Sequence, residues 1–327
     1  MTSFSHPMFW EKHTAFHFLK GGKRMAFICF DVGGTAVKHG VYSDNGQLVE
    51  KNDFSTPHAD KESFYQALSQ TITDYEKDYK IEGIGLSMPG FINPHSGEAI
   101  TAGALLNFYG ENILEGLKDY TDYPIAIEND ANCAALAEQA SGNAQDVDSF
   151  LLITIGTGIG GAIVLNQKLH QGYSYRAGEF GLMHLDVANR PLMTAHDLAS
   201  TSALVRDYKI HKNLPADTVV DARQIMIEKE TDPAVQAVFD NWLTYLSALI
   251  FNSSTFFNPD KILLGGGISA NESLIPAIEA QLEKDPAWKE MKTTIQSCHY
   301  YNEAGLRGAL ALITEQVSRQ QTAVEGV

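Results

Sequence analysis

Short apolar runs interrupted by glycine turns are the leading pattern of this chain. In residues 150–165 an apolar run breaks into a glycine-rich stretch, and a second apolar run follows. The second run is rich in β-branched residues, lacks a 3.6-residue period and ends at a polar Asn166-Gln167 pair. The pattern therefore predicts a strand, a glycine turn, a second strand and a tight polar turn.

The same layout occurs near the start of the chain. An apolar run at residues 26–30 leads into a glycine turn at 31–35, a second strand at 37–42 and the turn Asn45-Gly46. Asn-Gly between apolar runs is a strong hairpin signal. Two copies of one layout, far apart in sequence, indicate an internal duplication and two similar domains.

Other segments have the patterns of helices and buried strands. Residues 60–79 and 232–257 have the apolar pattern of helices, and an alanine-rich helix over 130–140 directly follows a short strand. A last helix begins near residue 302, and we expect its polar tail after Ser318 to be frayed. The order of these elements predicts an α/β protein.

The glycine turns indicate a nucleotide ligand. A turn without side chains lets backbone N–H groups close around a phosphate. A third turn, Gly265 to Gly267, follows a predicted strand and lets the backbone approach a flat group, so we expect the nucleoside of the ligand there. Asp31 lies at a predicted strand end and is expected to orient Mg²⁺ or its waters, although Asp-x-Gly-Gly also occurs in ordinary hairpins. The predicted phosphate-binding and nucleotide-binding residues are Asp31, Gly33, Gly34, Thr35, Gly156, Thr157, Gly158, Gly160, Gly161, Gly265, Gly266 and Gly267.

The letters Gly156-x-Gly158-x-x-Gly161 also match the dinucleotide fingerprint of dehydrogenases. That fingerprint requires a helix to begin at the glycines, so that the pyrophosphate lies at the helix N-terminus. A strand pattern follows here instead, and a dehydrogenase is therefore disfavoured.

Composition excludes several partners. The formal net charge is −16, which argues against a nucleic-acid or anionic-membrane partner. The three cysteines lie far apart without CxxC spacing, so neither a disulfide framework nor a thiolate metal site is expected. No apolar run approaches the length of a membrane helix, and no signal peptide is visible, so we expect a cytoplasmic protein.

Five motifs in sequence order resemble the ROK family of sugar kinases. This resemblance implies an actin-like (ribonuclease-H-like) two-domain ATPase fold, with a mixed sheet in each domain and a central cleft. It also implies ATP- and Mg²⁺-dependent phosphorylation of a sugar hydroxyl, with sugar and ATP as ligands and a homodimer as an open possibility. The motifs are Asp31-Val-Gly-Gly-Thr35, Glu128-Asn-Asp130, Gly156-Thr-Gly-Ile-Gly-Gly161, Gly178-Glu-Phe-Gly181 and Leu264-Gly-Gly-Gly-Ile-Ser269.

The resemblance assigns the site residues. Asp130 is implied as the base that accepts the proton of the sugar hydroxyl, although an aspartate before an alanine-rich helix also serves as an N-cap. Asn129 and Glu179 are implied to bind sugar hydroxyls. Gly90, in the turn after a buried strand, and Asn107 are further candidates for contacting the substrate.

The chain departs from the family pattern near residue 182. The family's usual histidine after Glu-x-Gly is Leu182 here, and residues 186–197 contain no cysteine of the usual zinc module. We therefore expect no zinc site and regard His184 and His196 as surface or loop histidines. These features resemble the β-glucoside kinases of the family and predict phosphorylation of the 6-hydroxyl of glucose or of a β-glucoside such as cellobiose. An N-acetylmannosamine or other hexose kinase, with Leu182 in the core, is the alternative.

Two further positions remain open. The family often has lysine directly after the threonine of the first turn, whereas this chain has Ala36 there and Lys38 two residues later. Lys20-Gly-Gly-Lys-Arg24 resembles a translated ribosome-binding sequence, which points to Met25 as the true start. A short N-terminal arm packed on the surface is an equal alternative.

The expected domains are an N-terminal extension over 1–24, a small domain over 25–138 plus 305–320, and a large domain over 139–304. A transcriptional repressor of this family would need a helix-turn-helix domain, for which the first 24 residues are too few. A non-catalytic sugar-binding regulator is a further alternative, disfavoured by the retained Asp31, Asp130 and both glycine turns.

Overall fold

The computed structural model describes residues 23–325, so most of the predicted N-terminal extension (1–22) lies outside the described residues. Two compact units divide the chain. Unit 1 contains the described residues up to Ala140 and those from Asn302 onward, and unit 2 is Ser141–Tyr301. Within the described range, no helix is both long enough and apolar enough to cross a membrane.

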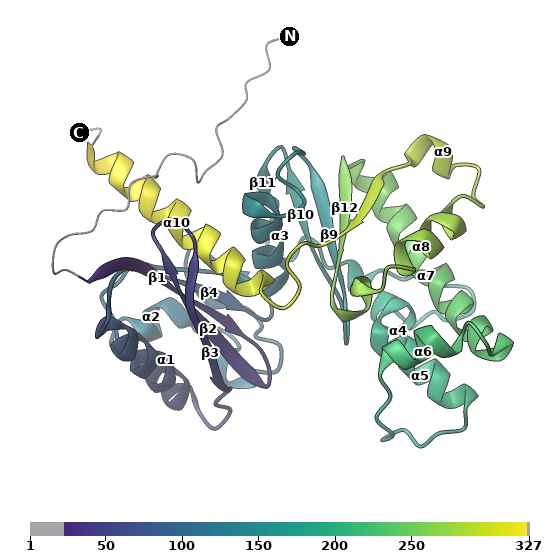
Figure 1. Cartoon of the computed structure of the whole chain (residues 1–327), viewed down its shortest axis with the longest axis horizontal. Helices are drawn as coiled ribbons and strands as arrows, with labels where there is room; N and C mark the ends of the chain where they lie inside the picture. Colours follow the sequence, from purple (N-terminus) through teal and green to yellow (C-terminus); the bar gives the residue numbers. More distant parts are fainter. Residues whose placement is uncertain (1–22, 326–327) are drawn as a thin grey trace, which may run out of the picture. The chain divides into compact units, whose positions relative to one another are not determined.

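Unit 1 contains a five-stranded mixed sheet in the order β3-β2-β1-β4-β8 (Figure 1). The first three strands pair antiparallel, because glycine and Asn-Gly turns connect them, whereas β4 and β8 run parallel to β1. The strands are β1 (Arg24–Val32), β2 (Ala36–Ser43), β3 (Leu48–Ser55), β4 (Tyr79–Met88) and β8 (Ile125–Asn129), with the short β5 (Ile92–Asn93), β6 (Glu98–Ala99) and β7 (Glu111–Asn112) in a separate small sheet.

Helices pack on both faces of this sheet (Figure 1). α1 and α2 contribute to one apolar cluster, and α10 contributes to another with Phe27 and Cys29. α10 packs closely against β4 because Gly85 has no side chain. A Cβ at Gly85 would lie only 2.2 Å from the Ala309 carbonyl oxygen. The helices are α1 (Lys61–Glu76), η1 (Leu106–Phe108), α2 (Ile113–Leu117), α3 (Asp130–Ser141) and α10 (Ala304–Glu325).

The expectation of a frayed tail after Ser318 is wrong, because α10 continues to Glu325. Arg319 pairs with Glu315 one turn earlier, and Thr322 Oγ1 donates to the Ser318 carbonyl oxygen (3.0 Å). The Arg319–Glu315 pair, four residues apart, stabilises this exposed end of the helix.

Unit 2 repeats the arrangement of strands. Its sheet has the order β11-β10-β9-β12-β13, with the first three strands antiparallel and the last two parallel to β9. Asn166 and Gln167 both have positive φ, as the tight polar turn requires. The predicted mixed sheet in each of two α/β domains is confirmed. The strands are β9 (Phe150–Ile155), β10 (Ile159–Leu165), β11 (Lys168–Leu169), β12 (Lys261–Gly265) and β13 (Thr294–Ser297).

Apolar faces of the helices pack against one side of the sheet of unit 2 and form a large apolar cluster with it. The longest helix, α7, begins with Asp232 as its N-cap and ends at Asn258, which has the left-handed conformation common after a helix. The helices are η2 (Phe180–Leu182), α4 (Ala195–Ala199), α5 (Thr201–His211), α6 (Ala222–Glu228), α7 (Pro233–Phe257), η3 (Gly267–Ala270), α8 (Leu274–Leu282) and α9 (Trp288–Met291).

Candidate active site

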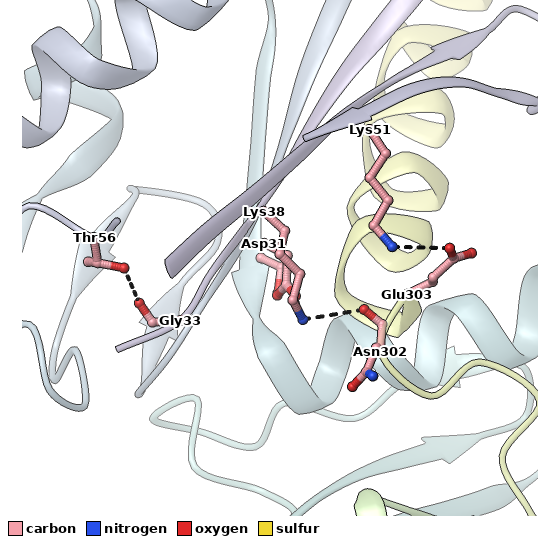
Figure 2. Close-up of polar contacts among 8 residues, drawn as sticks. Asp31, Gly33, Lys38, Lys51, Thr56, Asn302 and Glu303 are labelled. Atoms are coloured by element: carbon pink, nitrogen blue, oxygen red, sulfur yellow. Dashed lines mark hydrogen bonds and ion pairs between the residues drawn. The ribbon is translucent and has the colours of Figure 1, made fainter. Parts of the chain in front are cut away.

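Three parallel strands of unit 1 end side by side and bring polar residues together. Asp31, Ser87 and Asn129 lie at or near the carboxyl ends of β1, β4 and β8, where ligands of open α/β sheets bind. Ser87 Oγ donates to Asp31 Oδ1 (2.9 Å). Figure 2 shows Lys38 beside Asp31, with Nζ 3.5 Å from Asp31 Oδ2 and 3.3 Å from the Asn302 carbonyl oxygen. Lys38 thus compensates part of the charge of Asp31.

Asn129, rather than Asp130, caps α3. Its Oδ1 accepts from the N–H groups of Ala131 (2.9 Å) and Asn132 (3.1 Å). Its Nδ2 donates to the Gly90 carbonyl oxygen (2.8 Å) and to Asp130 Oδ1 (3.0 Å). The predicted substrate residues Gly90, Asn129 and Asp130 therefore form one cluster, although both polar groups of Asn129 already have protein partners.

Asp130 has the electrostatic environment of a base. The side chain reaches solvent but is densely surrounded by protein, and this burial raises the pKa of Asp130 to about 6, with the charge of Asp31 acting in the same direction. Hydrogen bonds from Ala131 N–H and Asn129 lower the pKa and limit the rise. Both of these bonds use Oδ1, and no other described residue donates a hydrogen bond to Oδ2. Oδ2 is therefore the oxygen available to a substrate hydroxyl.

The first glycine turn is held by residues that follow β3. Thr56 Oγ1 donates to the Gly33 carbonyl oxygen at 2.7 Å (Figure 2). His58 Nε2 donates to the Gly34 carbonyl oxygen (2.7 Å), and Asn107 Nδ2 donates to the His58 carbonyl oxygen (3.1 Å). Asn107 is thus linked to the glycine turn rather than to Asn129. Thr56 and His58 belong to no motif, so the sequence alone does not mark either residue.

The second glycine turn, between β9 and β10, is fixed through its backbone. Within the turn, Gly156 N–H donates to the Gly158 carbonyl oxygen (2.9 Å). Thr201 N–H donates to the Gly156 carbonyl oxygen (2.9 Å), and Ile159 N–H donates to His196 Nδ1 (2.9 Å). The description of His196 as a surface or loop histidine is therefore wrong, because it is half-buried in α4. His184 does lie exposed in a loop.

A cavity of about 1050 Å³ in unit 2 adjoins this turn. It brings together residues of two predicted nucleotide turns, Gly156 and Thr157 from one and Gly267 from the other. Gly266 packs against the end of β9, where a Cβ would lie 2.2 Å from the Ile155 carbonyl oxygen. Adenosine has both apolar and polar edges, and the mixed lining suits it. Lining residues that the sequence analysis missed include Thr201, Val205, Arg206, Lys209, Arg223 and Met226.

The turn that carries Glu179 packs directly on the glycine hairpin. Gly178 has φ of 89°, and a Cβ there would lie 2.7 Å from the Gly161 carbonyl oxygen. A Cβ at Gly161 would lie 2.3 Å from the Phe180 ring. Glycine at these positions lets the Glu179 turn lie against the turn predicted to bind phosphate. Leu182 at the end of this segment is 53% exposed, so it is not a core residue.

Potential metal ligands are sparse. Within residues 23–325, no three histidine, cysteine or carboxylate side chains gather as a metal site, and the three cysteines are buried free thiols. Asp31 offers a carboxylate that is only partly buried. A single carboxylate suits Mg²⁺, which keeps several waters and shares its other positions with phosphates.

The repeated sheet and the glycine turns at its strand ends define the actin-like class of two-domain nucleotide-binding proteins. The chain belongs to the ROK family, whose family model matches residues 27–316. A strand, β10, follows Gly158, which excludes the dinucleotide fingerprint of dehydrogenases.

Relatives with known names cover nearly the whole chain. It is 32% identical to a β-glucoside kinase of Listeria monocytogenes over 300 residues, which are 91% of this chain and 100% of the relative. It is 32% identical to a β-glucoside kinase of Klebsiella pneumoniae over 292 residues, which are 88% and 95% of the two chains. A solved ROK family protein from Streptococcus pneumoniae, in complex with sucrose, is 30% identical with a TM-score of 0.80 and covers 89% of this chain and 99% of its own.

Proposed function

We propose that this chain, an ATP-dependent carbohydrate kinase, transfers the γ-phosphoryl group of ATP to the 6-hydroxyl of glucose or of a β-glucoside such as cellobiose. The observation that carries the proposal is the separation of roles at the start of α3. Asn129 caps the helix, and this leaves Oδ2 of Asp130 available to a hydroxyl.

Asp130 would act as the general base. The sugar hydroxyl oxygen attacks the γ-phosphorus, the bond from that phosphorus to the bridging oxygen of ADP breaks, and the hydroxyl proton passes to Asp130 Oδ2. With a pKa of about 6, Asp130 is mostly ionised at neutral pH and can accept the proton. Such a base mainly orients the hydroxyl in line with the phosphoryl group.

The nucleotide would occupy unit 2 through the cavity beside Gly156 and Gly267. Backbone N–H groups of both glycine turns would hold phosphates. Mg²⁺ bound with ATP would lie near Asp31 and neutralise phosphate charge.

Leu182 supports a glycoside acceptor. Its exposed apolar side chain cannot donate a hydrogen bond to an anomeric hydroxyl, and residues 186–197 lack the cysteines of a zinc loop. A second sugar at the anomeric position would then meet an apolar surface instead of a polar partner. The names of the β-glucoside kinase relatives support the same acceptor class.

Comparison of kcat/KM for cellobiose, glucose and N-acetylmannosamine tests the acceptor. We expect cellobiose to be used at least as well as glucose, with the phosphate on the 6-position by NMR of the product. Turnover of free sugars with rejection of every β-glucoside would contradict the glycoside proposal. Sugar binding without any phosphorylation would instead indicate the non-catalytic regulator.

A further inference from the structure

The imidazole of His196 lies between the two turns of unit 2 described above. Its Nδ1 accepts from Ile159 N–H at 2.9 Å. A Cβ at Gly158 would lie 2.9 Å from Nδ1, and a Cβ at Gly181 would lie 2.2 Å from Cε1. The ring therefore occupies space that both glycines leave open, one in the phosphate turn and one in the Glu179 segment.

The helix that carries His196 is itself held firmly, although it is short. Thr194 and Asp197 form a capping box at its start, and Ala195 N–H donates to the Met183 carbonyl oxygen (2.7 Å). A few residues later, Thr201 N–H donates to the Gly156 carbonyl oxygen (2.9 Å). The segment 194–201 thus holds the glycine turn at two points, Ile159 through His196 and Gly156 through Thr201.

These contacts fix which groups of the turn are used inside the protein. Gly156 and Ile159 each donate their N–H to an acceptor in unit 2. Since Nδ1 accepts a hydrogen bond, the neutral ring carries its proton on Nε2. If this acceptor is removed, the Ile159 N–H loses its partner and the turn can change shape.

We propose that His196 is a positioning residue, which fixes the backbone of the Gly156–Gly161 turn for phosphate binding and sets the spacing between that turn and the Glu179 segment. The proposal rests on the assignment of this turn to ATP in the proposed function. The role of His196 goes beyond the proposed function, because His196 acts through the backbone of the turn and contacts neither the phosphates nor the reacting atoms.

Two substitutions of similar size separate the hydrogen bond from the packing. His196→Asn places an amide oxygen two bonds from Cβ, as Nδ1 is, and so keeps an acceptor for Ile159 N–H. His196→Leu fills similar space without an acceptor. His184→Leu, at an exposed histidine in the loop before α4, is the control.

Calorimetric titration with Mg·ADP gives the readout for nucleotide binding. We expect His196→Leu to raise the Kd roughly tenfold, the order expected for a buried N–H left without its acceptor. His196→Asn should stay within about threefold of the wild type, and His184→Leu should bind as the wild type does. Wild-type affinity in His196→Leu, or equal losses in the Leu and Asn variants, would overturn the proposal.

A second measurement does not need the variants to fold. Nitrogen-15 NMR of the imidazole in the unsubstituted protein should show the neutral ring with its proton on Nε2 and a hydrogen-bonded Nδ1. A proton on Nδ1, or a metal-shifted nitrogen, would contradict the proposal. If the protein binds Mg·ADP but phosphorylates no sugar, the proposed function fails. The Mg·ADP titration and the NMR measurement then still test the role of His196.

Discussion

Two neighbouring polar residues at the start of α3 have different hydrogen bonds. Both the amide oxygen and the amide nitrogen of Asn129 are hydrogen-bonded, to the backbone and to Asp130. Asp130 accepts hydrogen bonds from Asn129 and Ala131 through Oδ1. From the sequence, an aspartate before an alanine-rich helix is either a cap or a base. The atoms separate these roles, because the preceding residue already supplies the cap.

Asp130→Asn should reduce turnover roughly 10²–10⁴-fold, because an amide cannot accept the hydroxyl proton. Mg·ADP binding should survive, since both glycine turns stay intact. Asp122→Asn, on an exposed loop before β8, is the matched control and should keep full activity. Near-normal turnover of Asp130→Asn would move the base elsewhere.

The pH dependence of kcat/KM should report the same carboxylate. Burial, reinforced by the charge of Asp31, raises the pKa of Asp130 to about 6. A general base works only when ionised, so activity should be full above this pKa and should fall as the pH drops through about 6. Direct ADP detection between about pH 5 and 8 checks this expectation, and a profile flat down to pH 5 would contradict it.

At the scale of elements, the hairpins could be predicted from the sequence, but the residues that hold their glycine turns in place could not. Glycine turns and Asn45-Gly46 restrict the backbone locally, so β1 to β3 and β9 to β11 follow from short stretches of sequence. The glycine turns are held by hydrogen bonds from residues elsewhere in the chain. These residues are Thr56, His58, His196 and Thr201. Their role depends on tertiary packing, and no local pattern marks it.

The two lysines of Figure 2 offer a matched test of the first hairpin. Lys38 contacts Asp31 and the carbonyl oxygen of Asn302, whereas Lys51 pairs with Glu303 at 3.1 Å, and Asn302 and Glu303 immediately precede α10. Lys38→Met removes a cation near the phosphate turn and leaves Asp31 less compensated. The phosphates lose the attraction of this cation, so KM for Mg·ATP should rise roughly three- to tenfold.

Lys51→Met is the control for the Lys38 substitution. It removes an exposed ion pair beside the same helix and should change KM for Mg·ATP by less than about twofold. Equal effects of the two substitutions would mean that Lys38 only stabilises the position of α10 and does not contribute to phosphate binding.

Metal removal tests the segment that replaces the zinc module. We expect no stoichiometric zinc, and full activity after chelation once Mg²⁺ is restored, because residues 186–197 lack cysteine and Nδ1 of His196 already accepts from Ile159 N–H. Elemental analysis that finds one tightly held zinc per chain would contradict this expectation.

At the scale of the whole molecule, the duplication explains why the fold was predictable. Both units have the same strand order, with three antiparallel strands followed by two parallel ones. Repeated glycine hairpins in the sequence indicate that repetition directly. The acceptor sugar has no comparable signal, because it depends on how a few exposed side chains such as Leu182 meet a ligand.

Each unit has its own apolar core, and the core of unit 1 contains a buried histidine. His39 in β2 lies 2.8 Å from the Tyr75 hydroxyl through Nδ1, with its ring between those of Phe30, Phe54 and Tyr75. Burial lowers the pKa of His39 below its usual value, and the charge of Asp53 opposes the shift only in part. The folded protein therefore holds this histidine neutral at neutral pH.

Acidification should weaken the protein through this residue. A histidine whose pKa is lower in the folded state gives the unfolded state more bound protons, so stability is full above the unfolded pKa of about 6.5 and falls as the pH drops below it. The loss can reach about 1.4 kcal/mol per pH unit. Calorimetric Tm values at about pH 7.5 and 5.5 should therefore differ less in His39→Gln than in the wild type, whereas His170→Gln, at an exposed histidine, should keep the wild-type difference. If His39→Gln and the wild type lose the same Tm, the acid sensitivity lies in other groups, the carboxylates first among them.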